Sequence, residues 1–124
     1  MRELLAAGKI KTAMQPFLDK GFFFEYFYEK GENGEPVYIC RFKKGKSSLD
    51  WRESEDGSQI AFWVKTKEKT TVLNLKERFP KQHRRFFWKH FFRKATIDER
   101  RIFLAKLLVL ELESENHDFF GIEK

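Results

Sequence analysis

The chain has 124 residues and carries 25 lysines and arginines against 19 acids, for a net charge of +6. Aromatic residues make up 17% of it, which excludes a disordered chain, and the single cysteine, Cys40, excludes a scaffold held by internal disulfides. This length suits one domain with a hydrophobic core, so we expect a single domain over residues 1–124. No apolar run is long enough to cross a bilayer and no secretory signal is found, so we expect a cytoplasmic protein.

Apolar residues recur at helical spacing through the first twenty residues and predict a helix there. Pro16 falls inside this pattern, where it either kinks the helix or begins a second short one. Gly21 suits the position just after a helix, where a positive φ is needed.

The period of the pattern then changes from 3.6 to two, which is typical of strands. The predicted strands cover residues 22–28, 37–43, 48–53 and 60–65. Asp56-Gly57 is the strongest hairpin signal in the chain. Residues 70–75 predict either a fifth strand or an extended lead-in to the next helix. The short turns indicate an antiparallel meander of four to five strands.

Two helices are predicted to follow the meander. Pro80 suits the first turn of one helix, which runs to about Lys94. Thr96 and Glu99 have the spacing of a capping box, which begins a last helix over residues 97–114. We therefore predict an α+β fold, with an N-terminal helix, the meander, and two C-terminal helices packed on the sheet.

The positive charge is concentrated in one segment. Residues 76–94 hold eight lysines and arginines against one acid, a net charge of +7, while the rest of the chain has a net charge of −1. A helical wheel places four aromatic residues of this segment on one stripe, which is typical of a helix side buried in the core. They are Phe87, Trp88, Phe91 and Phe92. Arg84 falls inside the stripe, and Phe86 falls on the polar side among the cations.

The simplest interpretation is an amphipathic helix with its aromatics in the core and its charges in water. The functional interpretation is a non-enzymatic module that binds nucleic acid through the basic aromatic helix at about residues 80–94. Clustered cations attract phosphates, and an exposed Phe86 could stack or wedge. The predicted site residues are Lys81, Arg84, Arg85, Phe86, Lys89 and Arg93.

The acidic C-terminal residues weaken this interpretation. Residues 107–124 have a net charge of −4, and a helix hairpin would bring them near the basic segment and neutralise part of it. An anionic membrane surface is a further possible target, but we expect the helix to be needed to cover the sheet.

A second surface comes from the strands. If the strand faces coincide, the side of the sheet away from the helices mixes aromatic rings with cations and could stack unpaired bases. These residues are Phe23, Phe27, Arg41, Lys43, Trp63 and Lys65. Burial of this face by a second layer or a partner subunit is the competing interpretation. The last helix is apolar nearly all round, which indicates either a central helix or a homodimer interface. A protein-interaction or homodimerisation module is therefore the alternative function.

No catalytic motif is found, so we expect neither an enzyme nor a cofactor. His83 and His90 share a helix side without completing a metal set, so we expect no metal site. Cys40 is predicted to be an inert core residue. Four carboxylates gather around one hairpin and are interpreted as solvated turn residues. They are Asp50, Glu53, Glu55 and Asp56.

Overall fold

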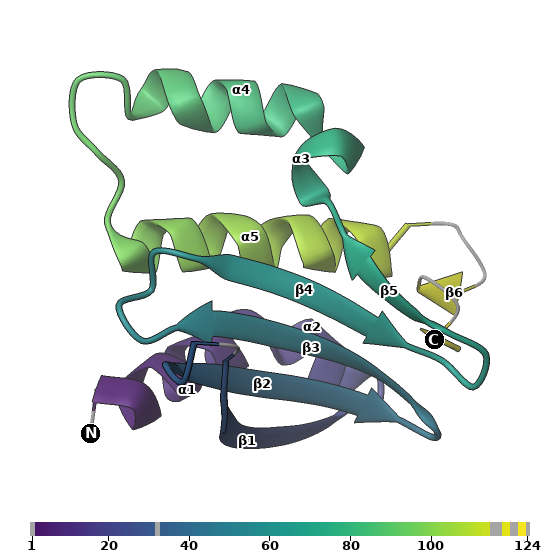
Figure 1. Ribbon diagram of the computed structural model, residues 1–124. Coiled ribbons are helices and arrows are strands. Elements are labelled where there is room, and N and C mark those ends of the chain that lie inside the picture. The colour runs from purple at the N-terminus through teal and green to yellow at the C-terminus, as the bar shows by residue number, and fades with distance from the viewer. Residues whose placement is uncertain (1, 32, 115–117, 120–121, 124) are drawn as a thin grey trace.

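The computed structural model describes residues 2–31, 33–114, 118–119 and 122–123, and the side chains of residues 5–31 and 33–114. It shows an N-terminal helical segment, a five-stranded antiparallel sheet and C-terminal helices, which confirms the predicted α+β class. Figure 1 shows this order along the chain.

The N-terminal segment is two helices, α1 (Arg2–Ala13) and α2 (Gln15–Asp19). Pro16 lies in the first turn of α2, where its missing N–H needs no acceptor, so it begins a second helix and does not kink a longer one. Gly21 has the expected positive φ, 93°, and turns the chain into the sheet.

The sheet follows the chain order β1-β2-β3-β4-β5, and every neighbouring pair is antiparallel. Its strands are β1 (Phe23–Lys30), β2 (Pro36–Lys44), β3 (Ser47–Ser54), β4 (Ile60–Lys65) and β5 (Thr70–Leu73). Residues 70–73 thus form a fifth strand, which settles the alternative left open by their composition. β3 is the central strand and the most buried.

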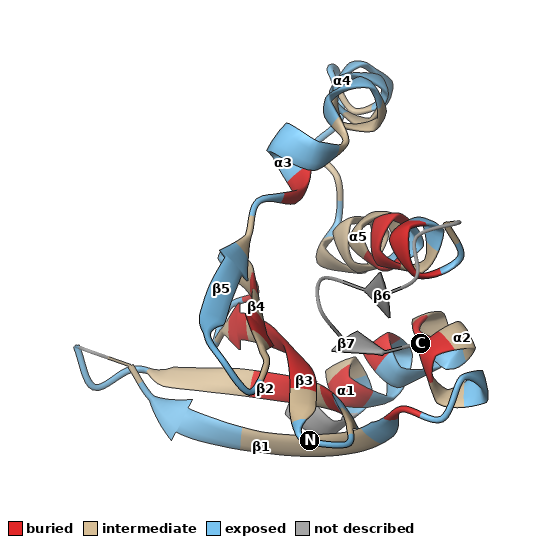
Figure 2. Ribbon diagram, turned by 90° about the vertical axis from the view of Figure 1, so that its right-hand side faces the viewer, coloured by how far each residue is buried: buried red, intermediate tan, exposed pale blue. Residues whose placement is uncertain are grey.

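One face of the sheet is covered by α1, α2 and α5 (Ile97–Leu112), as Figure 2 shows. The core between them includes Phe17, Phe42, Trp51 and Leu108, each fully buried. Tyr26, Cys40, Trp51 and Phe62 lie opposite one another across four strands on this face. β1 therefore turns Tyr26 toward the helices and Phe23 and Phe27 away from them, as expected.

The C-terminal half continues with α3 (Leu75–Arg78) and α4 (Pro80–Lys89) before α5. Thr96 and Glu99 form the predicted capping box at the start of α5. α4 ends at Lys89, about five residues before the predicted end, and α5 ends at Leu112. Beyond α5, β6 (Asp118–Phe119) pairs with β7 (Ile122–Glu123).

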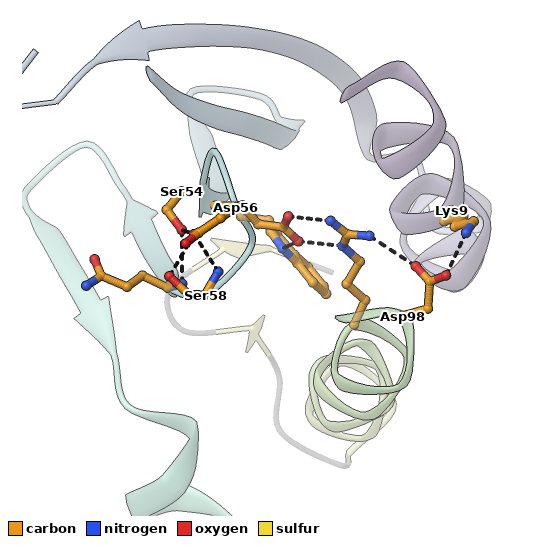
Figure 3. A network of polar contacts seen from close by, with 9 residues as sticks. Lys9, Ser54, Asp56, Ser58 and Asp98 are labelled. Atoms are coloured by element: carbon orange, nitrogen blue, oxygen red, sulfur yellow. Dashed lines mark hydrogen bonds and ion pairs between the residues drawn. The ribbon is translucent and has the colours of Figure 1, made fainter. Parts of the chain in front are cut away.

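A chain of ion pairs joins α1, α5 and β3. Arg101 on α5 donates two hydrogen bonds, each 2.8 Å long, to the two carboxylate oxygens of Glu53 on β3. Arg101 also donates to Asp98, which accepts a 2.6 Å bond from Lys9 of α1 (Figure 3). The Trp51 indole donates to Glu53 from the core. These contacts tie α5 to both α1 and the central strand β3.

The prediction of solvated turn carboxylates is therefore wrong for two residues. Asp50 is fully buried and is held by Arg41, and Glu53 is buried against Arg101. The prediction holds for the exposed Asp56, which accepts hydrogen bonds from Ser54 and Ser58 within the β3–β4 turn (Figure 3). Spacing along the chain places carboxylates near a hairpin but does not show which of them meet an arginine from elsewhere.

Candidate nucleic-acid interface

α4 contacts α5 through three residues spaced as one side of a helix. The ring of Phe86 stacks on Phe103 of α5 with centroids 4.2 Å apart. His83 lies edge-on against the same Phe103 ring at 5.0 Å. His90, one turn after Phe86, lies 3.5 Å from the Glu99 carboxylate. α4 is thereby held on the outer side of α5, and Figure 2 shows α4 at the top of the molecule.

This packing corrects the prediction for Phe86. The wheel placed Phe86 on the exposed polar side, and the structure turns it toward α5. A wheel shows which residues share a side of a helix, but it does not show which side faces the protein. Here Phe103 of α5 packs against the side of α4 that carries His83 and Phe86.

The predicted core stripe is instead the exposed side. Phe87, Trp88, Phe91 and Phe92 are 60%, 66%, 53% and 97% exposed. Their rings contact one another, with centroids 5.3 Å apart for Trp88–Phe91 and 4.9 Å for Phe91–Phe92. We call these four residues the aromatic cluster. Arg84, the charged exception inside the predicted stripe, was the sequence signal that this side is not buried.

Six of the eight cations in residues 76–94 make no ion pair within the part of the chain that the structure describes. The two exceptions are Arg78, paired with the buried Glu111, and Arg93, which lies 3.5 Å from Glu99. All six unpaired side chains are exposed. They are Lys76, Lys81, Arg84, Arg85, Lys89 and Lys94.

The predicted site residues therefore divide into three groups. Lys81, Arg84, Arg85 and Lys89 are exposed on α4 and free to meet an anion. Arg93 is exposed beside Glu99. Phe86 is withdrawn from the surface, and the aromatic cluster is present in its place.

Neutralisation by the acidic C-terminal residues is confined, in the described part, to one pair. Glu111 on α5 meets Arg78, at the start of the basic segment. The rest of the predicted neutralisation falls on residues 115–124, whose side chains lie outside the described residues.

The junction between α4 and α5 gathers its polar groups around Glu99. Hydrogen bonding from the Thr96 backbone N–H, the largest cause, and the nearby Arg93 charge lower the pKa of the Glu99 carboxyl. The His90 ring is nearly buried here, with its Nδ1 atom lacking a hydrogen-bond partner in the described structure. These contacts tie the segment after α4 to the start of α5.

The sheet face away from the helices forms a second surface. The register puts Phe23 opposite Lys43, and Arg41 in one cross-strand row with Trp63. The expected coincidence of the strand faces is thus confirmed. The Arg52 guanidinium, missed in the sequence, lies over the Trp63 ring at 4.1 Å. No helix in the described residues covers this face (Figures 1 and 2).

Comparison with known proteins adds no relative. No protein-family model matches the chain, and no curated protein or solved structure matches it significantly. None of the helices described is both long and apolar enough to span a membrane. The two surfaces described above are therefore the basis for inferring the function.

Proposed function

We propose that this protein is a non-enzymatic, cytoplasmic nucleic-acid-binding module whose α4 helix contacts backbone phosphates. The observation that carries the proposal is the set of six exposed, unpaired cations in residues 76–94. Cations held near one another without protein partners gain free energy from a polyanion because condensed counterions are released from it.

The cations are arranged to follow a phosphate backbone. Lys81, Arg85 and Lys89 are four residues apart, so they lie along one side of α4. Arg84 and Arg85 each present a guanidinium fork, which fits phosphate oxygens better than a point charge does. Few neutral hydrogen-bonding side chains accompany them, Gln82 being one. We therefore expect binding with little dependence on base sequence.

The aromatic cluster lies beside these cations, with Phe87 and Trp88 on α4 and Phe91 and Phe92 just after its end. Rings that are more than half exposed next to arginines and lysines can stack on unpaired bases or wedge between base pairs. This gives the cluster a role that a merely solvated charged helix does not explain, since exposed apolar patches of this kind mark interaction sites.

The test is fluorescence anisotropy with labelled single-stranded and duplex oligonucleotides over a range of salt concentrations. The variant is Lys81→Gln/Arg85→Gln/Lys89→Gln. The matched control, Lys30→Gln/Arg100→Gln/Lys106→Gln, removes the same charge from residues that make no ion pair in the described structure. We expect the α4 variant to bind more weakly on all sequences, with a salt slope lower by about one for each phosphate it no longer neutralises, and the control to match the wild type.

Equal affinities for the α4 variant and the control would contradict the proposal. Anionic phospholipid vesicles serve as a second target, because a basic helix with exposed aromatics also suits a lipid surface. Binding to vesicles but to no oligonucleotide would replace nucleic acid with an anionic membrane surface as the target.

The aromatic cluster also favours a second candidate, a protein-interaction module. Aromatic residues are enriched at protein interfaces, and those that anchor a partner are often Trp. Self-association through α4 would bring like charges together, so an acidic partner fits this side better than a second copy. Binding of an acidic protein to this side, or a stable homodimer formed through another surface and measured by light scattering, would favour this candidate if nucleic-acid binding that depends on salt is not found.

A further inference from the structure

Charge on the sheet is separated along the strand direction. Residues 43–47 and 65–69, which span the β2–β3 and β4–β5 turns, carry six lysines and one glutamate. Residues 31–36 and 54–59, which span the other two turns, carry four acids and no cation. Consecutive turns of a meander lie at opposite ends, so the first two segments meet at one end, as Figure 1 shows. We call this the lysine end.

The net charge of the chain does not reveal this separation of charge between the two ends of the sheet. Outside residues 76–94 the net charge is −1, because the lysine end and the acidic turns nearly cancel. In space they are a strand length apart, about 20 Å. That distance exceeds the Debye length of about 8 Å at physiological ionic strength, so the two ends act as separate patches.

The lysine end continues onto the uncovered face as one cross-strand row. Phe23, Lys43, Ser48, Lys65 and Thr70 are paired in register across all five strands. Phe23 is 65% exposed at one end of the row. Lys43 and Lys65 are two strands apart, about 10 Å, and have no ion-pair partner in the described structure.

The next rows supply flat groups and no free negative charge. The Arg52 guanidinium covers one side of the half-buried Trp63 ring at 4.1 Å. Asp50 is buried and bonded by Arg41 through both carboxylate oxygens, and Glu29 lies 3.7 Å from Arg52. Glu25 lies close enough to Arg41 to act on its charge. The acids of this face therefore each have a cation beside them.

We propose that the uncovered sheet face at the lysine end binds single-stranded nucleic acid, with Lys43 and Lys65 on its phosphates and a base stacked on Phe23. Aromatic rings and guanidinium planes on a sheet can stack only bases that are not already paired. A duplex presents no unpaired base to these rings, so the proposal assigns this face to single strands alone. The proposal depends on the nucleic-acid function proposed above and adds a second surface to it.

The first test compares two sets of substitutions matched in β1. The variant is Phe23→Ala/Lys43→Gln/Lys65→Gln, and the control is Tyr28→Ala/Lys30→Gln/Lys106→Gln. Phe23 and Tyr28 are 65% and 66% exposed on opposite faces of the same strand, and each set removes two lysines. With labelled oligonucleotides, we expect the variant to lose about tenfold or more in single-strand affinity and to keep its duplex affinity within about twofold. The control should match the wild type on both targets.

The second test separates stacking from simple apolar contact. Phe23→Leu keeps an apolar side chain without a ring, and Phe23→Trp keeps a ring. Stacking predicts weaker single-strand binding for Phe23→Leu and retained binding for Phe23→Trp. Equal affinities for these two variants would overturn the stacking role of Phe23. Circular dichroism and urea unfolding show whether each variant is folded.

The outcomes distinguish this inference from the proposed function. If no oligonucleotide binds the wild type at low salt, both fail. If binding depends on the α4 cations and the sheet variant matches the wild type, only this inference fails. Equal losses on single strands and duplexes would make the lysine end a general phosphate contact and overturn the single-strand assignment.

Discussion

The ring of Phe86 on α4 lies nearly parallel to the ring of Phe103 on α5, with centroids 4.2 Å apart and an interplanar angle of 12°. This contact decides which side of α4 faces solvent. Because Phe86 turns inward, Phe87 and Trp88 turn outward with the basic side chains beside them. The exposure of the candidate interface therefore follows from the packing of Phe86, together with His83 and His90, against α5.

We expect Phe86→Ala to lower the free energy of unfolding by about 1–2 kcal/mol, because it removes a half-buried ring and its stacking contact with Phe103. Phe87→Ala, at a site 60% exposed, should change it by less than about 0.5 kcal/mol. Urea denaturation followed by circular dichroism measures both. A larger loss of stability for Phe87→Ala than for Phe86→Ala would mean that Phe87, and not Phe86, packs against α5 in solution.

The fold was largely predictable from the sequence because its signals are local. The change of period from 3.6 to two marks where the helices give way to the sheet. Helix starts are marked by Pro16, which lacks a backbone N–H, and by the two capping hydrogen bonds between Thr96 and Glu99. The short turns leave a meander as the simplest order, and the structure has it.

The candidate site was less predictable because it depends on contacts between distant segments. Periodicity could not show that Phe103 would receive Phe86, or that Arg101 would bury Glu53. The lysine end could have been predicted from the sequence, since alternate turns of a meander lie at the same end of the sheet. The charge count along the chain concealed it because opposite ends cancel.

The buried pair of Arg101 and Glu53 is expected to be a strong determinant of stability. Arg101→Met should lower the free energy of unfolding by about 3–5 kcal/mol, because it leaves the Glu53 carboxylate buried without its cation. Adding Glu53→Gln should recover part of the loss, since the amide is neutral and can still accept from Trp51. Arg100→Met, the neighbouring arginine without an ion pair in the described structure, serves as the control for urea denaturation. Equal stability of Arg101→Met and the control would contradict this role.

Cys40 is expected to be unreactive in the folded protein. Burial, together with the Glu53 charge, raises its pKa to about 12, and the thiolate is the reactive form. A disulfide reagent at pH 8 should modify the native thiol at least about 100-fold more slowly than the thiol in urea. Because the folded pKa is raised, the folded state holds this proton more tightly, and stability falls as pH rises from about 8.5 toward 12. Cys40→Ala should lose that part of the alkaline dependence. Rapid modification without urea would show that the β2–β3 region opens readily.

Acid should destabilise the protein through carboxylates whose pKa values are lowered by folding. The Lys9 hydrogen bond, the largest cause, lowers the pKa of Asp98, and the Ser58 backbone N–H lowers that of Asp56 to about 2. A carboxylate with a lowered folded pKa stabilises the native state fully above its unfolded pKa, near 4, and loses this contribution as pH falls through the folded value. The urea concentration at the midpoint of unfolding should therefore decrease as the pH is lowered from about 4 to about 2.

The same series tests Asp98 by substitution. Asp98→Asn should be less stable than the wild type at pH 7, and the difference should shrink as the pH falls through the lowered pKa of the Asp98 carboxyl, because protonation weakens its bond to Lys9. Lys9→Gln, which removes the partner, should behave in the same way. Glu113→Gln, at an exposed residue without an ion pair in the described structure, should follow the wild-type curve. A difference in stability between Asp98→Asn and the wild type that does not shrink as the pH falls would show that Asp98 acts by packing and not by charge.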